Sequence, residues 1–136
     1  MIMYIPKYFR LEECVSKKVF ERFGQRAWEF FDDRALITQD ALRERYGKII
    51  INDWLWGGHF DSRGFRAPDD TDGAEFSAHK RGQAFDSIFQ DVTAEEVRRD
   101  ILKNPNLFPY INAIEAGISW FHQDCRNCKR IKVFYP

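Results

Sequence analysis

The most restrictive feature of this sequence is a short alternating segment, residues 84–89, which carries one carboxylate. Alternation with a period of two is typical of a β-strand, and it places Ala84, Asp86 and Ile88 on one face. The opposite face then carries Phe85, Ser87 and Phe89. Asp86 is therefore expected on a rigid strand, with its direction set by the backbone.

Helical patterns come before this strand. Residues 11–23 place apolar side chains at helical spacing and are followed by a glycine, a residue favoured where helices end. A second helix, capped by Asp32 or Asp33, is expected to run to Tyr46 and stop at the next glycine. The β-branched run at residues 48–52 then predicts a strand buried on both sides.

The rest of the chain completes an α+β pattern. Residues 57–75 are rich in Gly, Asp, Pro and Arg and predict a long loop, a kind of segment that often carries function. Residues 93–96 form a capping box that opens a helix, and strands are expected at 118–123 and 131–135. This order predicts one α+β domain over residues 1–136, with a small, mostly antiparallel sheet and N-terminal helices on one face.

Histidines on either side of this strand predict a metal site. His79 precedes Asp86 by seven residues, and Gly82 lets the chain turn sharply between them. Ala84 is small on the face of Asp86, so an imidazole can fold back beside the carboxylate. His122, on a later strand, supplies a third ligand if the two strands are neighbours. Two histidines and one carboxylate leave a fourth zinc position for water, as in hydrolytic sites, so we expect one Zn²⁺ per chain.

Composition excludes several other classes of function. Lys plus Arg and Asp plus Glu both number 21, so no basic excess is available to bind nucleic acid. The apolar N-terminus is too short for a signal peptide and no later run is long enough to span a membrane, which predicts a protein made soluble in a cytoplasm. Cys14, Cys125 and Cys128 are too few for a disulfide scaffold, and a lone C-x-x-C lacks the second pair that a structural zinc site needs. The oligomeric state is left open.

The segment from Ser77 to Asp86 also carries a family resemblance. Its pattern S-x-H-x-x-G-x-A-x-D, followed by a histidine on a terminal strand, resembles the zinc D-alanyl-D-alanine carboxypeptidases and dipeptidases, distant relatives of the hedgehog signalling domain. Residues 57–68 resemble the arginine-bearing loop of that family, and residues 8–13 are similar to the opening helix of its short bacteriophage-borne members. Together these segments extend the resemblance over nearly the whole chain.

The resemblance implies a hedgehog/DD-peptidase-like fold and a set of site residues. The family members bind zinc through the residues that match His79, Asp86 and His122, and the residues that match Arg66 and Ser77 face the substrate. The planar donor fork of Arg66 suits a peptide carboxylate or a developing oxyanion. The implied substrate is the D-amino-acid-containing stem peptide of peptidoglycan, and carboxypeptidase and endopeptidase action both remain open.

The family resemblance also implies where the protein acts. The resemblance implies a phage endolysin or virion-associated lysin that acts at the bacterial cell wall. Without a signal peptide, it would reach the wall after holin-type release or from the phage particle.

The general base is the point at which this sequence departs from the family. Many relatives carry Glu or Asp three residues before the last histidine, but that position here is Ser119. Glu115, seven residues before His122 and across the Gly117 turn, is our candidate for the base. Asp124, on the strand face of His122, is expected to orient a metal-bound imidazole and is the reserve candidate for the base. The alternative is a non-catalytic virion or interaction domain that keeps the fold and the zinc site.

Overall fold

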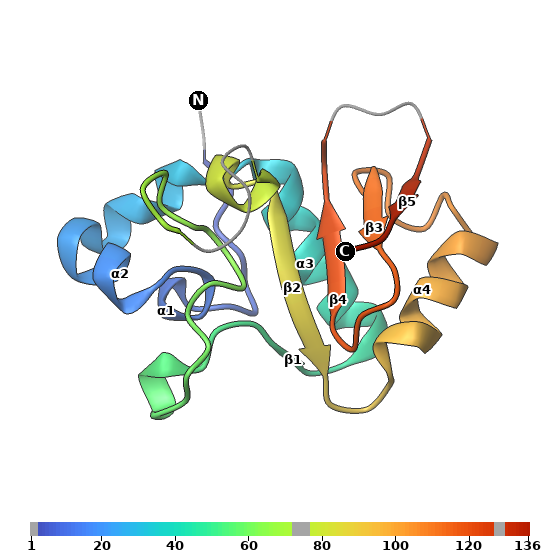
Figure 1. Ribbon diagram of the computed structural model, residues 1–136, viewed down its shortest axis with the longest axis horizontal. Coiled ribbons are helices and arrows are strands. Elements are labelled where there is room, and N and C mark those ends of the chain that lie inside the picture. The colour runs from blue at the N-terminus through green and yellow to red at the C-terminus, as the bar shows by residue number, and fades with distance from the viewer. Residues whose placement is uncertain (1–2, 72–76, 127–129) are drawn as a thin grey trace.

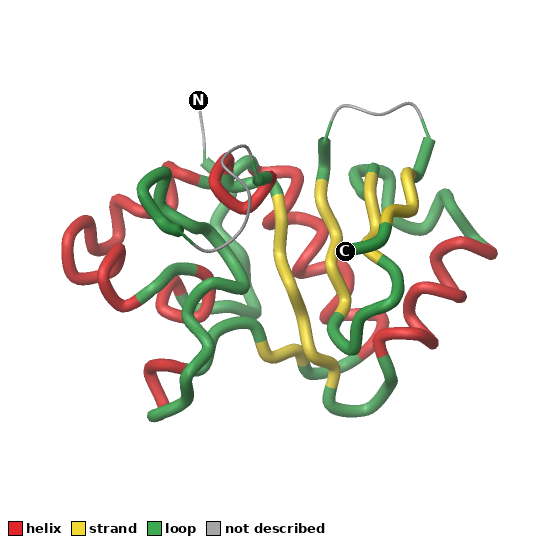
Figure 2. Tube along the Cα trace, viewed as in Figure 1, coloured by secondary structure: helices red, strands yellow, loops and turns green. Residues whose placement is uncertain are grey.

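The computed structural model describes residues 3–71, 77–126 and 130–136 and confirms the α+β class (Figures 1 and 2). The α-helices are α1 (Leu11–Cys14), α2 (Lys17–Phe23), α3 (Asp33–Tyr46) and α4 (Ala94–Lys103). The strands are β1 (Ile49–Ile50), β2 (Ala84–Phe89), β3 (Ala113–Glu115), β4 (Phe121–Asp124) and β5 (Lys132–Phe134). Three 3₁₀ helices accompany them: η1 (Gly24–Phe30), η2 (Trp54–Trp56) and η3 (Ala78–Arg81).

The five strands form one mixed sheet in the order β1-β2-β4-β3-β5. β2 is antiparallel to both β1 and β4, and β3 is antiparallel to β4, but β3 and β5 run parallel. The expectation of a mostly antiparallel sheet is therefore corrected. The difference comes from β5, which follows β4 along the chain but lies beyond β3 at the edge of the sheet.

The register of the sheet aligns polar residues from separate parts of the chain. Asp86 of β2 lies opposite His122 of β4, and His122 lies opposite Glu115 of β3. Directly paired residues of neighbouring strands point to the same face, so these side chains form one row. Asp124 lies in the adjacent row, between Ala84 and Ala113.

The opposite face of the sheet is covered by α3, which lies behind β2 and β4 in Figure 1. Ser87 and Gln123 point to this face because they alternate with Asp86 and His122. The Gln39 side chain of α3 donates to Ser87 Oγ at 3.0 Å and accepts from Gln123 Nε2 at 3.2 Å. The N-terminal helix α3 thus packs on one face as predicted, whereas α1 and α2 lie beside the sheet.

The predicted helix at residues 11–23 is divided in two. Val15 adopts an extended conformation with φ −130° and ψ 166°, which ends α1. Ser16 then begins α2 as its N-cap, and its hydroxyl accepts a hydrogen bond from the backbone N–H of Val19 at 3.1 Å. The helical spacing of apolar residues continues across this break, but the local serine cap decides the backbone.

The strands also differ in part from those predicted. β1 covers only two residues at a sheet edge, and Ile50 is 38% exposed while Ile49 is 4% exposed, so the expectation of a strand buried on both sides is wrong. β3 was not predicted, and Ser119 and Trp120 lie before β4 rather than within it. β2 matches its predicted bounds.

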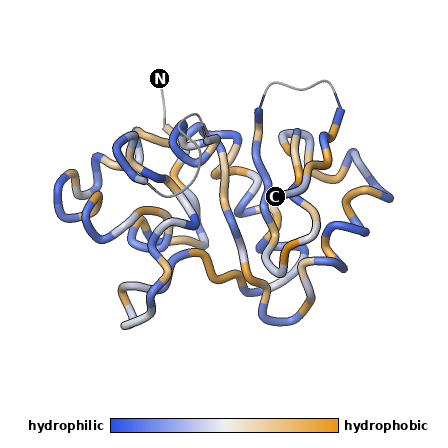
Figure 3. Tube along the Cα trace, viewed as in Figure 1, coloured by the Kyte–Doolittle hydropathy of each residue, from blue (hydrophilic) through white to orange (hydrophobic). Residues whose placement is uncertain are grey.

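The helix α4 follows its capping-box prediction. Thr93 caps the helix and Glu96 completes the reciprocal bond. Apolar and polar residues alternate along α4 in Figure 3; Val97 and Ile101 are buried in the core, whereas Leu102 is 45% exposed. Within the described parts of the chain, no helix combines the length and the apolar character needed to cross a bilayer. Cys14 and Cys125 are buried free thiols, and Cys128 lies outside the described residues.

Candidate metal centre

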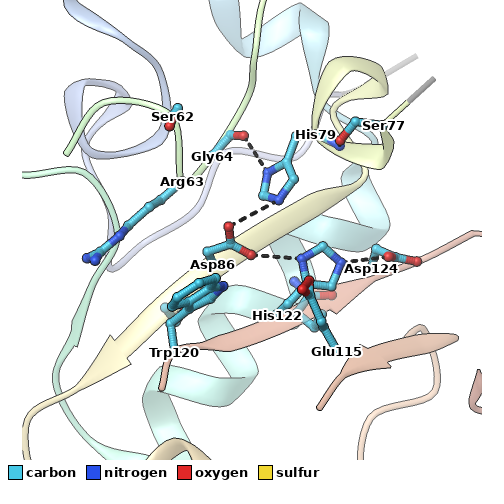
Figure 4. Close-up of polar contacts among 12 residues, drawn as sticks. Ser62, Arg63, Gly64, Ser77, His79, Asp86, Glu115, Trp120, His122 and Asp124 are labelled. Atoms are coloured by element: carbon cyan, nitrogen blue, oxygen red, sulfur yellow. Dashed lines mark hydrogen bonds and ion pairs between the residues drawn. The ribbon is translucent and has the colours of Figure 1, made fainter. Parts of the chain in front are cut away.

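The three predicted ligands meet at one buried point. One ligand atom each from His79, Asp86 and His122 can be chosen so that all lie within 4.8 Å of one another. Asp86 lies between the two rings: its Oδ2 is 3.3 Å from His79 Nε2, and its Oδ1 is 2.7 Å from His122 Nδ1 (Figure 4). The group predicted from the sequence is confirmed as a cluster that could hold a metal ion.

The turn before β2 brings His79 back over the strand. Ser77 begins the 3₁₀ helix η3, and its hydroxyl accepts from the backbone N–H of His79 at 3.2 Å. Gly82 ends the helix with φ +68°, a conformation that favours glycine. A Cβ at this position would also lie 2.0 Å from the carbonyl oxygen of Phe30. The glycine is therefore required for the turn that places the imidazole beside Asp86.

A backbone carbonyl orients the His79 ring. Its Nδ1 lies 2.8 Å from the carbonyl oxygen of Gly64, which can only accept, so the proton sits on Nδ1 and Nε2 is left as a donor atom for a metal. Gly64 can approach because it has no side chain: a Cβ there would lie 2.1 Å from the Cys14 carbonyl oxygen. The loop is tied on both sides, by Phe65 N–H to Cys14 at 2.8 Å and by Arg66 N–H to His79 at 3.1 Å.

A carboxylate orients the His122 ring. Its Nε2 lies 2.7 Å from Asp124 Oδ2, so its Nδ1 is the atom that faces Asp86. The side chain of Asp124 is fully buried. Arg126 holds this carboxylate with two side-chain bonds, from Nε to Oδ1 at 2.8 Å and from Nη2 to Oδ2 at 2.6 Å.

Charge coupling within the cluster is strong. Burial alone would raise the pKa of Asp86, but the neighbouring His79 and His122 outweigh it and hold that pKa well below its usual range. Burial alone would lower the pKa of His122, but its bonds to Asp124 and Asp86 raise it to about 9. Asp124 is likewise opposed by burial, yet its bonds with His122 and Arg126 lower its pKa to about 2. These contacts favour the ionised form of both carboxylates and the charged form of the His122 ring.

The donor set fits a divalent metal ion. Each histidine has one ring nitrogen directed at Asp86 and the other held by an oxygen acceptor, Gly64 O or Asp124 Oδ2. Metal-binding histidines almost always donate their second ring N–H to a carboxylate or carbonyl in this way. Two imidazoles and one carboxylate suit zinc and related transition metals.

A pocket of about 460 Å³ opens over the cluster. It is lined by the three ligands together with Arg66, Ser77 and Glu115, so the structure brings together the residues predicted to bind metal and substrate. Arg66 Nη2 lies 3.6 Å from Asp86 Oδ2, and Arg66 Nε donates to the Ser62 carbonyl at 2.7 Å. Its guanidinium is thus held at the edge of the metal cluster.

The two candidate bases occupy different positions around His122. Glu115 is half-buried, lies directly opposite His122 in the register and lines the pocket (Figure 4). Asp124 is fully buried behind the ring. Ser119, three residues before His122, lines a separate pocket formed with the β2–α4 connection. Glu115 therefore faces the pocket, whereas Asp124 orients the ring from behind.

Two residues of the site were missed in the sequence. Gly64 contributes a carbonyl, which no side-chain pattern reveals. Arg126 follows His122 and Asp124 at intervals of two, and this alternation was the available signal. The third histidine, His59, lies in the segment predicted as a loop at residues 57–75. Its side chain is exposed to solvent.

Comparisons of the chain with protein-family models, with curated proteins and with solved structures each found no match. The functional interpretation therefore depends on the geometry of the site and on the sequence motif.

Proposed function

We propose that this protein is a zinc-dependent peptidase with a hedgehog/DD-peptidase-like fold that hydrolyses a bond in the stem peptides of peptidoglycan. The observation that carries the proposal is the buried pair of histidines around Asp86, each with its outer nitrogen held by an oxygen. The S-x-H-x-x-G-x-A-x-D pattern, which resembles that of D-alanyl-D-alanine peptidases, supports the choice of reaction and substrate.

The ligands supply one nitrogen from each of His79 and His122 and a carboxylate oxygen from Asp86. When bound, zinc would polarise a scissile carbonyl and lower the pKa of water from about 16 to about 7. The pocket opens over these three side chains, so a peptide could approach the metal site from that side.

The remaining roles fall to side chains that line the pocket. Glu115 accepts the proton of the attacking water and passes it to the leaving amine, the usual work of a carboxylate base. Arg66 binds the negative charge that develops on the carbonyl oxygen or the carboxylate of the peptide. Ser77 holds the turn that carries His79 and presents its hydroxyl at the pocket wall.

The biological setting in this proposal is a bacteriophage lysin that acts at the bacterial cell wall. Access to the wall would come from holin-type membrane disruption or from the phage particle. The partner is the stem peptide, and neither nucleic acid nor membrane is required.

The proposal is tested with purified protein, zinc analysis and synthetic stem peptides that end in D-alanyl-D-alanine. We expect one zinc per chain and new peptide fragments by mass spectrometry. A chelator should abolish cleavage and added zinc should restore it. Intact peptides and intact cell walls after incubation with zinc-loaded protein would exclude the peptidase and favour the non-catalytic interaction domain. Absence of stoichiometric zinc would exclude both.

A further inference from the structure

Arg126 stands immediately behind the His122 side of the metal cluster. It follows β4, its guanidinium contacts Asp124, and it also lines the pocket. We propose that Arg126 is a positioning residue of the metal centre: it fixes the Asp124 carboxylate, which in turn fixes the His122 ring with Nδ1 toward the metal. The inference rests on the metal-binding part of the proposed function and is independent of catalysis.

The contacts leave the carboxylate little freedom to rotate. Asp124 Oδ1 accepts from the side-chain Nε of Arg126 at 2.8 Å and from its backbone N–H at 3.2 Å. Asp124 Oδ2 accepts from Arg126 Nη2 at 2.6 Å and from His122 Nε2 at 2.7 Å. A two-pronged bond of this kind specifies the plane of the carboxylate as well as its position.

The neighbouring strands do not supply a substitute for this arginine. The residues directly opposite Asp124 are Ala84 and Ala113, whose methyl groups cannot donate hydrogen bonds. The arginine itself is held from another side, because its guanidinium carbon lies 4.6 Å from the centre of the Phe134 ring. Arg126 thus contacts both the end of β4 and β5. These contacts restrict its movement, and through Asp124 they restrict the rotation of the His122 ring.

Electrostatics and positioning predict opposite effects when the charge of Arg126 is removed. A cation that lines the pocket repels a metal cation, so its loss should strengthen zinc binding if charge alone matters. Loss of a residue that orients a ligand should weaken zinc binding, and removal of such outer partners costs about 10- to 100-fold in metal affinity. The sign of the change therefore separates the two roles.

The experiment measures the zinc dissociation constant by competition with a chromogenic chelator. We expect Arg126→Gln to weaken binding by about 10-fold, the low end of the range for direct partners of a ligand, because Arg126 acts through Asp124. Arg126→Lys keeps the charge but not the fork and should weaken binding by an intermediate factor. Arg81→Gln is the matched control, because Arg81 lines the same pocket, is exposed, and should leave the affinity unchanged or slightly higher when replaced. In the Co²⁺-loaded protein, Arg126→Gln should also change the visible absorption bands, which report ligand geometry.

A second background tests whether Arg126 acts through Asp124. In Asp124→Asn protein, the further change Arg126→Gln should add little, because coupled residues give non-additive effects. Zinc binding by Arg126→Gln that is as tight as in the parent, or tighter, would overturn the inference, as would full additivity with Asp124→Asn. If Arg126→Gln fails to fold by circular dichroism, Arg126→Lys decides, and parent-like affinity would overturn the inference. A parent that binds zinc but cuts no stem peptide would refute the peptidase alone.

Discussion

The two histidines of the candidate metal centre, His79 and His122, are oriented by different kinds of structure. His79 comes from a short 3₁₀ helix and is held by a backbone carbonyl from a loop. His122 comes from a central strand and is held by a buried carboxylate with its own arginine. The loop-held ring depends on close packing of irregular backbone, whereas the strand-held ring depends on sheet register and charge. Mutations that affect one ring and spare the other can therefore separate these two modes of support.

The largest effect is expected at Asp86, which contacts both rings. Asp86→Asn keeps the size of the side chain but removes the charge that faces His79 and His122. We expect the loss of stoichiometric zinc and of peptide cleavage, a larger effect than the 10- to 100-fold typical of outer partners. Zinc is measured by elemental analysis after gel filtration. Asp91→Asn, at an exposed carboxylate, is the control and should retain both.

The next substitution tests whether Glu115, which lies opposite His122 in the sheet, performs the proton transfer. Glu115→Gln keeps a hydrogen-bonding side chain opposite His122 but cannot take up a proton. Turnover of a stem peptide should fall by about 10²- to 10⁴-fold while zinc content is unchanged. Ser119→Ala is the matched control and should be fully active, since Ser119 lines a different pocket. Parent-like turnover in Glu115→Gln would remove this residue from the mechanism.

Substitution of Gly64 tests the support of His79 by the loop carbonyl. In Gly64→Ala the new Cβ would meet the Cys14 carbonyl oxygen at 2.1 Å, so the loop must shift and withdraw the acceptor of His79 Nδ1. We expect zinc affinity to fall about 10- to 100-fold. Overpacking should also lower the free energy of unfolding by about 1 to 3 kcal/mol, measured by urea denaturation of the metal-free protein.

The control for that substitution is Gly57→Ala. Gly57 has φ +87° but no neighbouring atom within 4 Å of an added Cβ. Its replacement should cost about 1 kcal/mol of stability through backbone strain and leave zinc affinity unchanged. A loss of zinc affinity in this variant would mean that global stability, not the carbonyl of Gly64, governs the site.

The last prediction concerns the pH dependence of zinc binding by the strand-held ring, an effect of about tenfold for each pH unit. The pKa of His122 in the metal-free protein is raised from 6.5 to about 9, so below pH 9 zinc must displace a proton from this ring. Affinity should therefore fall as pH decreases, by about tenfold per pH unit for that proton between pH 9 and 7. Chelator competition at several pH values measures the slope. In Asp124→Asn, which removes one of the negative charges that raise this pKa, the dependence should begin at a lower pH.

The parts of the fold that were predictable are those in which local and long-range preferences agree. β2 was found at its correct bounds because its alternation distinguishes the core face from the pocket face. The capping box of α4 was equally informative, since Thr93 and Glu96 satisfy each other locally. The break between α1 and α2 was missed because the apolar spacing continues across Ser16. The short strand β3 has too few residues to display a period.

In the candidate site, too, the features set by local sequence were predictable and those set by distant contacts were not. The cluster of His79, Asp86 and His122 was predictable because imidazole and carboxylate side chains occur at a recognisable spacing. The support of His79 was not, because the Gly64 carbonyl is presented by a contact with Cys14, fifty residues away in the sequence. The parallel placement of β5 was also hidden, since it depends on how the chain crosses β3. Backbone acceptors and crossovers leave no signature in residue type.

The contact of Gln39 with Ser87 and Gln123 on the far side of the sheet affects more than packing. If β2 and β4 were each displaced by one residue, Ser87 and Gln123 would enter the pocket, and Asp86 and His122 would face α3. An amide that hydrogen-bonds both strands from behind recognises only the native alignment. Gln39 therefore favours the register in which Asp86 and His122 face the pocket, so a helix on the far side of the sheet helps to set the position of the candidate ligands.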